Sequence, residues 1–230
     1  MKRIGIIVAM KEEFEALYDK IGKKIETIYN GNREIYFYKR KDLDIYVTDT
    51  AEGEIQASSM TQYLITKFDI DLILNFGLCG SLNPKYKCKD LVVIKEMVHY
   101  DFDITSLRHD YIVGQYFGQN GNVFYADKHM IDKVMKIEAL PLVKVASADK
   151  FVGDNDFKRK LIDEFNADIC EMESAGIMIT AKTNNVPSLL IKCISDNAGD
   201  EAHMDFNDIV SQGIDSYVEL IIKFLDSLAK

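Results

Sequence analysis

Short apolar runs alternate with stretches of helical periodicity along most of this 230-residue chain. Runs such as Ile4–Ala9 and Leu72–Phe76 have polar flanks and the length of strands that are buried on both faces. Between these two runs, Gln56–Phe68 has the periodicity of a helix. Strands that alternate with helices predict an α/β fold, with a mixed, mostly parallel central sheet flanked by helices.

The other expected elements follow the same pattern. The further expected strands are Glu34–Arg40, Leu43–Thr48, Leu91–Val98, Leu142–Ser147 and Ser188–Ser195. The further expected helices are Glu12–Ile21, Met172–Asn184 and an amphipathic helix from about Asn207 whose apolar stripe includes Ile209, Ile214 and Val218. The glycine-rich residues 77–81 are expected to form a turn, and 99–123 a long loop. Without repeats or a proline-rich linker, residues 1–230 are predicted to form a single domain.

Charge and composition exclude several classes of function. The chain has 28 basic and 37 acidic residues and no basic stripe, so a nucleic-acid-binding protein is not expected. No stretch approaches the roughly 20 apolar residues of a membrane span, and the apolar run near the N-terminus is too short for a signal peptide. The four cysteines lack a paired spacing, which indicates reduced thiols and a cytoplasmic protein.

Polar residues gather where the expected strands end, which is where α/β sheets bind ligands. These segments are Met10–Glu13, Gly77–Ser81, Phe151–Gly153, Glu171–Glu173 and Ser195–Asp196. Each has a simple structural explanation on its own. An acid such as Glu13 is favoured in the first turn of a helix, Asp196 could cap a helix, and phenylalanines usually belong to the core. The two acids that bracket Met172, between a buried strand and an apolar helix, are harder to explain structurally.

Taken together, these segments resemble a known enzyme family. The motifs are IGIIVAMKEEFEAL, NFGLCGSL, VASADKFVGD, CEMESAG and IKCISDNAGDEAHMDF, and they span almost the whole chain. Their order and spacing are similar to those of 5′-methylthioadenosine/S-adenosylhomocysteine nucleosidases, in the superfamily of purine nucleoside and uridine phosphorylases. The resemblance implies a nucleoside phosphorylase-like fold and hydrolysis of the N-glycosidic bond of an adenine nucleoside, without a cofactor or metal. It also implies a homodimer, in which a loop within residues 101–118 completes the neighbour's site.

The resemblance assigns roles to individual residues. Glu13 is expected to be the general base that activates water, and Asp196 the general acid that protonates N7 of the purine. Glu173 is expected to hold the ribose hydroxyls above Met172. Phe151, Val152 and Phe206 are expected around the base, with His203 near the lid that carries Phe206. The whole implied site consists of Met10, Glu13, Glu52, Leu78, Cys79, Gly80, Phe151, Val152, Glu171, Met172, Glu173, Lys192, Ser195, Asp196 and Phe206.

Four positions depart from the family pattern. Leu78 replaces a small hydroxyl residue, and Lys192 replaces an arginine beside the catalytic water, which keeps the charge but not the planar fork. Glu52 stands where an apolar residue usually faces the 5′-alkylthio group, and Arg108 has no counterpart. Because a glutamate in an apolar pocket is costly unless it is paired or solvated, we expect a more polar 5′ pocket that favours a hydroxyl or charged substituent.

Three alternative functions remain open from the sequence. A purine nucleoside phosphorylase would need a cationic phosphate site, whereas VAMKEEF and LILNFGLCG contain only Lys11 as a basic residue. A nucleoside sensor without catalysis would have little use for Glu13, Glu173 and Asp196 together. A metal hydrolase could be suggested by His99, Asp101 and Asp103, but the sequence shows no matching distant ligands.

Overall fold

The strands belong to one mixed sheet in the computed structural model, which describes residues 2–212, 215 and 217–229. The strands are β1 (Arg3–Val8), β2 (Lys23–Asn30), β3 (Arg33–Arg40), β4 (Leu43–Asp49), β5 (Leu72–Ser81), β6 (Leu91–His99), β7 (Val123–Tyr125), β8 (Leu142–Ser147), β9 (Ile169–Glu171) and β10 (Ser188–Asp196). The helices are α1 (Lys11–Glu15), α2 (Glu54–Phe68), α3 (Lys128–Ile137), α4 (Asn155–Phe165), α5 (Ser174–Thr183), α6 (Ala202–Gln212) and α7 (Val218–Leu228).

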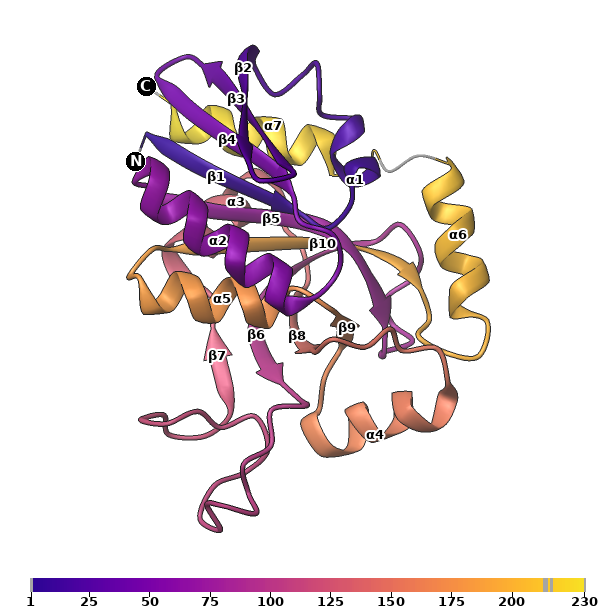
Figure 1. The fold of residues 1–230 in the computed structure, drawn as a ribbon. Helices are drawn as coiled ribbons and strands as arrows, with labels where there is room; N and C mark the ends of the chain where they lie inside the picture. The colour runs from indigo at the N-terminus through magenta and orange to yellow at the C-terminus, as the bar shows by residue number, and fades with distance from the viewer. Residues whose placement is uncertain (1, 213–214, 216, 230) are drawn as a thin grey trace.

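The centre of the sheet is parallel, and one edge is an antiparallel meander. β1 pairs in parallel with β4 and β5, and β5 pairs in parallel with β10, while β2, β3 and β4 pair antiparallel. Strands β5, β10, β6, β8 and β9 are linked by successive pairings into a closed ring. The prediction of an α/β fold with a mixed sheet and flanking helices is therefore confirmed (Figure 1).

Helices cover both faces of the sheet, as the apolar strands require. In β1, Ile4 and Ile6 belong to a buried cluster that includes residues of α3 and α7. The intervening Ile7 belongs to a second cluster with residues of α2 and α5. Figure 1 shows α2 and α5 side by side on one face, with α7 and α3 on the other. Alternate side chains of a strand point to opposite faces of the sheet, so a strand that is covered on both faces has a continuous apolar sequence.

The predicted turn at residues 77–81 is wrong, because β5 continues through them to Ser81. All residues from Leu72 to Ser81 are buried, and Lys192 to Asp196 of β10 pair alongside them. Glycines in a strand interior often mark a close approach of other groups rather than a turn. In this fold the carboxyl groups of Glu13 and Asp196 approach the strand closely at Gly77 and Gly80.

Both ends of the chain also differ from the sequence prediction. The expected helix Glu12–Ile21 ends at Glu15, and the chain continues through turns such as the Leu17 N–H to Phe14 carbonyl hydrogen bond, which keep Leu17 buried. The single C-terminal helix is in fact two helices, α6 and α7. Ile214, expected on the apolar stripe, lies outside the described residues. Four elements, β2, β7, α3 and α4, were not predicted from the sequence, and the buried strand expected before Met172 is β9.

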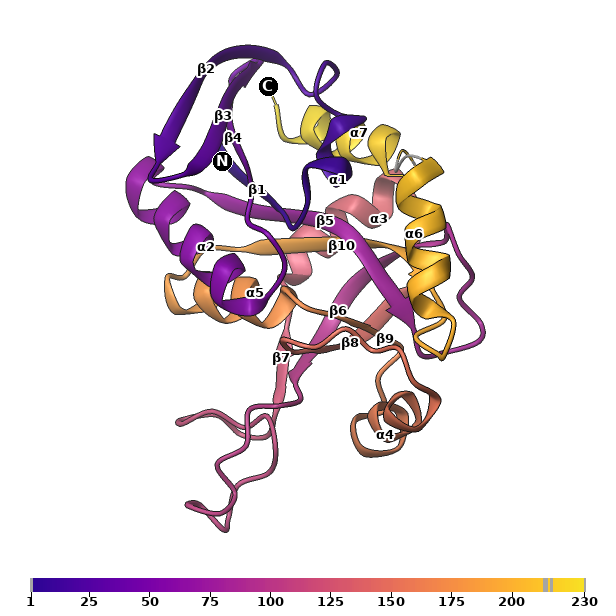
Figure 2. The same ribbon diagram turned by 45° about the vertical axis from the view of Figure 1, so that its right-hand side comes forward.

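The segment between β6 and β7 projects from the rest of the molecule in both ribbon views (Figures 1 and 2). It has no helix or strand from 100 to 122, as expected for a long loop. Aromatic packing holds its base: the Phe102 and Tyr116 rings stack with centroids 4.0 Å apart, and Tyr116 meets Phe124 edge-on. Among the described residues, no helix has the length and apolar character needed to cross a bilayer.

Candidate active site

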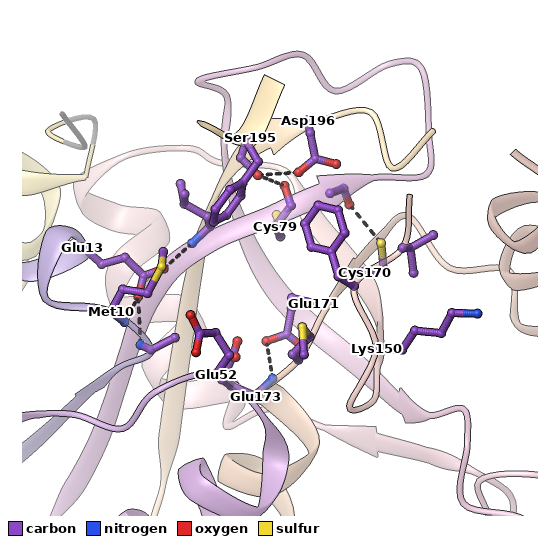
Figure 3. A pocket seen from close by; sticks show the side chains of 17 residues that line it. Met10, Glu13, Glu52, Cys79, Lys150, Cys170, Glu171, Glu173, Ser195 and Asp196 are labelled. Carbon is purple, nitrogen blue, oxygen red and sulfur yellow. Dashed lines mark hydrogen bonds between the residues drawn. The ribbon is translucent and has the colours of Figure 1, made fainter. Parts of the chain in front are cut away.

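One pocket of about 560 Å³ contains every expected site residue except Lys192 (Figure 3). It lies where the carboxyl ends of β1, β5 and β10 meet, as the topology of parallel sheets predicts. Its lining residues are Ala9, Met10, Glu13, Glu52, Leu78, Cys79, Gly80, Lys150, Phe151, Val152, Cys170, Glu171, Met172, Glu173, Ser195, Asp196 and Phe206.

The Glu13 carboxylate is fixed by three backbone N–H groups. Its Oε2 atom accepts hydrogen bonds from Ala9 at 2.8 Å and Met10 at 3.1 Å, and its Oε1 atom accepts one from Leu78 at 2.9 Å. The bond to Met10 follows from the position of Glu13 in the first turn of α1, where a glutamate can reach back to the residue before the helix. The departure at Leu78 therefore leaves a backbone contact to Glu13 intact.

Asp196 lies at the end of β10, in a buried position opposite Gly80. The Ser195 hydroxyl donates to Asp196 Oδ2 at 2.6 Å, and the Ala198 N–H donates to Oδ1 at 2.7 Å. The pairing of β10 with β5 is irregular between Ile194 and Asp196, and such bulges re-aim side chains. A Cβ atom on Gly80 would lie only 2.9 Å from Asp196 Oδ1, so the glycine makes room for this carboxyl group.

Lys192, Glu171 and Glu173 form a buried ionic group behind the pocket. The Lys192 ammonium lies 2.9 Å from Glu171 Oε2 and 3.8 Å from Glu173 Oε2. Glu171 also accepts the N–H groups of Glu173 and Ser174 at the start of α5. Glu173 Oε1 accepts the Gly53 N–H at 3.2 Å. The lysine thus compensates two carboxylates that a pocket of this kind could not otherwise hold.

The carboxyl groups of the pocket differ in the direction of their pKa shifts. Burial raises the pKa of Glu13, although Lys192 and the backbone N–H groups oppose it, and burial also raises the pKa of Asp196. Burial and the negative charges of Glu171 and Glu13 raise the pKa of Glu173 to about 8, against the effect of Lys192. Burial also acts on Glu171, but its contact with Lys192 holds its pKa below the ordinary value. Carboxyl groups with different proton affinities in one pocket are suited to acid–base chemistry.

Two phenylalanines border the opening of the pocket. The rings of Phe151 and Phe206 meet edge-on, with centroids 5.9 Å apart, and Phe151 is 45% exposed. Phe206 comes from α6, and His203 is an exposed residue of the same helix. Glu52 is also exposed, so this carboxylate remains solvated rather than buried in an apolar pocket.

Three of the lining residues, Ala9, Lys150 and Cys170, are not among those that the motifs predict. Ala9 and Cys170 are strand-end neighbours of expected residues, whereas Lys150 precedes Phe151 and extends over the Phe157 ring, 3.4 Å from its centroid. Cys79 is one of the predicted lining residues, and the reactivity of a cysteine depends on its thiol pKa. Its thiol is buried, and burial raises its pKa well above the ordinary value, so it is not an activated nucleophile.

The acids and bases of the long loop lie outside this pocket. His99 contacts both Asp101 and Glu54, whereas Asp103 accepts hydrogen bonds from the N–H and hydroxyl of Thr105. Arg108 extends toward the Tyr111 ring within the loop. A hydrolytic centre made from the three residues of the H-x-D-x-D string is therefore not formed.

Comparison with known proteins agrees with this geometry. Residues 3–228 match the family model described as "Phosphorylase superfamily". An aminodeoxyfutalosine nucleosidase of Campylobacter jejuni is 27% identical over 234 residues, covering 99% of this chain and 100% of that protein. A 5′-methylthioadenosine/S-adenosylhomocysteine nucleosidase of Staphylococcus aureus is 31% identical over 209 residues, covering 88% of this chain and 90% of that protein.

Solved structures give the same result at the level of the fold. A Helicobacter pylori 5′-methylthioadenosine/S-adenosylhomocysteine nucleosidase, complexed with a substituted pyrrolidin-3-ol, superposes with a TM-score of 0.92 at 26% identity over 98% of both chains. A futalosine hydrolase of the same organism also superposes with a TM-score of 0.92, at 25% identity over 98% of both chains. The chain therefore belongs to the phosphorylase superfamily and, within it, to the family of 5′-methylthioadenosine/S-adenosylhomocysteine nucleosidases.

Proposed function

We propose that this protein hydrolyses the N-glycosidic bond of an adenine nucleoside, releasing adenine and the free ribose derivative. The observation that carries the proposal is the Glu13 carboxylate, which three backbone N–H groups orient in a pocket that also contains Asp196. The candidate substrates are those of its relatives: 5′-methylthioadenosine, S-adenosylhomocysteine and aminodeoxyfutalosine. Adenosine and other 5′ variants are included because of Glu52.

Glu13 is the general base in this proposal. As a bond forms between the water oxygen and C1′ of the ribose, Glu13 takes a proton from the water. A general base must be both ionised and correctly oriented. The three N–H donors provide orientation, and together with the charge of Lys192 they favour the ionised form against the effect of burial.

Asp196 is the general acid. As the C1′–N9 bond breaks, its electron pair moves into the purine, and Asp196 delivers a proton to N7, so that neutral adenine leaves. Burial raises the proton affinity of this carboxyl group, which keeps a larger fraction protonated near neutral pH. The Ser195 hydroxyl and the Ala198 N–H orient it and stabilise the carboxylate that remains after proton transfer.

Glu173 and Met172 bind the sugar in this proposal. Glu173 accepts hydrogen bonds from the ribose 2′ and 3′ hydroxyls, and Met172 packs beneath the ring. Cleavage of a nucleoside passes through a state with positive charge on the ribose. Even with Glu173 protonated, the carboxylates of Glu13 and Glu171 outnumber the single buried Lys192 and give the pocket a negative potential that stabilises this charge.

The same potential disfavours phosphorolysis, which is the alternative on this fold. A phosphate dianion needs a cationic cradle. Among the described residues that line the pocket, the cationic side chain is that of Lys150, which lies over the Phe157 ring. Lys192 is already engaged with Glu171 and Glu173. Water is therefore the proposed nucleophile.

We further propose a homodimer in which residues 101–118 of each chain complete the neighbour's site. The projecting loop supports this, because Leu107 is 79% exposed and Phe117 83% exposed in the single chain. Large apolar side chains clustered on an exposed segment usually meet a partner. Analytical ultracentrifugation of the wild type and of Leu107→Asp tests this: a dimer that becomes a less active monomer is expected.

We also propose that the protein works in the cytoplasm, where cysteines outside disulfides, like these four, remain reduced.

The activity test uses purified protein with methylthioadenosine, S-adenosylhomocysteine, aminodeoxyfutalosine, adenosine and inosine, each with and without phosphate. Adenine and free sugar are expected without phosphate, with no gain when phosphate is added. Glu13→Gln and Asp196→Asn should each lose activity while the fold is retained. Formation of a sugar 1-phosphate only in the presence of phosphate would replace this proposal with phosphorolysis.

A further inference from the structure

A second cluster of ionisable side chains lies outside the catalytic pocket, where the long loop leaves the sheet. Glu54 is the first residue of α2, His99 the last residue of β6, and Asp101 lies at the start of the loop. Glu54 is buried, His99 is half-buried and Asp101 is exposed, so the cluster has one side open to solvent. The sequence showed no distant metal ligand to accompany His99 and Asp101, and the fold brings Glu54 to them as a third possible ligand.

The three side chains converge on one nitrogen atom. His99 Nε2 lies 2.8 Å from Glu54 Oε2 and 2.7 Å from Asp101 Oδ1, and all three atoms lie within 4.8 Å of one another. An imidazole nitrogen carries at most one hydrogen, so the two carboxylates share a single proton. A cation in the place of that proton can bond to all three atoms and neutralise both carboxylates.

Neighbouring groups orient the cluster as they do in metal sites. His99 Nδ1 lies 2.7 Å from the Tyr116 hydroxyl, so the second ring nitrogen is engaged when Nε2 binds a ligand. The Ser147 hydroxyl donates to Glu54 Oε1 at 2.9 Å, which leaves Glu54 Oε2 directed at His99. Partners of this kind fix the orientation of metal-binding histidines and carboxylates.

We propose that Glu54, His99 and Asp101 bind one divalent transition-metal ion of the zinc or cobalt class per chain, with water on the open side. One imidazole and two carboxylates suit these ions, whereas magnesium and calcium prefer oxygen ligands alone. Two carboxylates and a neutral imidazole balance the charge of the ion. The ion ties α2 to the base of the 99–123 loop and takes no part in glycosidic cleavage.

The proposed metal ligand Glu54 follows Gly53 in the sequence, and Gly53 contacts Glu173 in the catalytic pocket. Gly53, next to Glu54, donates its N–H to Glu173, and the Glu54 N–H is fixed by Asp149 Oδ1 at 2.7 Å. Fixing Glu54 therefore steadies the start of α2 and this contact. Metal binding and its effect on stability can both be measured without turnover, so they are independent of the proposed reaction.

The test is a titration of chelator-treated full-length protein with Co²⁺, followed by its visible absorption, and with Zn²⁺, followed by calorimetry. One ion per chain is expected for the wild type. His99→Gln and Asp101→Asn should weaken binding at least about tenfold, since even the loss of an outer partner of a metal ligand has an effect of this size. His109→Gln is the matched control in the same loop, and it should bind like the wild type.

Thermal unfolding provides a second measurement that does not depend on activity. Zn²⁺ should raise the unfolding midpoint of the wild type and of His109→Gln, because an ion that binds only the folded state stabilises it. It should not raise that of Asp101→Asn, an exposed position whose change leaves the core intact. The absence of saturable binding by the wild type, or equal binding by Asp101→Asn and the wild type, would overturn the proposal and leave a protonated His99 that bridges two carboxylates.

Discussion

Gly77 leaves open the space that the Glu13 carboxylate occupies: a Cβ atom at position 77 would lie 2.5 Å from Glu13 Oε1 and 3.0 Å from its Cδ. Gly80 stands in the same relation to Asp196, at 2.9 Å from Oδ1. The two glycines of one strand thus clear room for the two carboxyl groups proposed to act as base and acid. Their role is close approach rather than chain reversal.

Gly77→Ala should therefore displace Glu13 from its three N–H donors. We expect kcat/KM to fall by about 100-fold, the effect of a displacement of about 1 Å in a catalytic group. Gly31→Ala is the control: an added Cβ meets nothing within 4 Å, so activity should be unchanged. Its φ of +61° should lower the unfolding free energy by about 1 kcal/mol. A folded Gly77→Ala variant with wild-type kcat/KM would show that Glu13 is not held in this way.

Lys192 should contribute to stability through the carboxylates it compensates. Lys192→Met leaves Glu171 and Glu173 without a buried counter-charge, and we expect the unfolding free energy to fall by about 3–5 kcal/mol. The exposed Lys87→Met should change it by less than about 0.5 kcal/mol. Urea unfolding measures both values. Adding Glu171→Gln to Lys192→Met should restore part of the loss, and a double variant as unstable as the sum of the single variants would contradict the pairing.

Glu173 should make stability depend on pH. Its pKa is raised from 4.5 to about 8, first by burial, so between these values the folded state keeps a proton that the unfolded state has lost. The unfolding free energy should therefore fall as pH rises through this window. Unfolding at a series of pH values should show a flatter dependence for Glu173→Gln, whereas Glu201→Gln, on an exposed residue, should match the wild type. An unchanged slope in Glu173→Gln would assign the dependence to other groups.

The sequence predicted the parts of the fold where periodicity and burial coincide. Buried runs such as Ser188–Ser195 form strands within one residue of the expected bounds, because apolar residues that face both layers leave few other solutions. Shorter elements such as β7, with three residues, are too short to show a periodic pattern. Helix α4 was missed although it begins with an Asp154 side-chain cap on the Phe157 N–H, a local signal that was available.

The pocket residues could be grouped from motifs, but their contacts could not. The same limit holds outside the pocket, where the contact between Glu54 and His99 depends on the placement of α2 against the end of β6. Beside the pocket, the contact of Lys192 with Glu171 likewise depends on how β10 is placed relative to β9. Strand register and helix packing fix such distances, and no spacing in the sequence encodes them.

Glu52 should influence which 5′ substituent the enzyme prefers. Glu52 lines the pocket as an exposed carboxylate, so it can accept a hydrogen bond from a 5′-hydroxyl or attract a cationic group, but offers little to a methylthio group. Glu52→Ile should raise the ratio of kcat/KM for methylthioadenosine over adenosine by roughly tenfold or more, because polar and apolar contacts are exchanged at one position.

Glu52→Gln separates the two possible causes of this preference. An amide keeps the shape and the hydrogen-bonding capacity but removes the charge, so it should bring the ratio only part of the way toward that of Glu52→Ile. Initial rates of adenine release from both nucleosides, measured for the three proteins, give the comparison. If Glu52→Ile left the ratio unchanged, Glu52 would be a solvated rim residue without influence on specificity. The proposed catalytic roles of Glu13 and Asp196 would be unaffected, since their contacts do not involve Glu52.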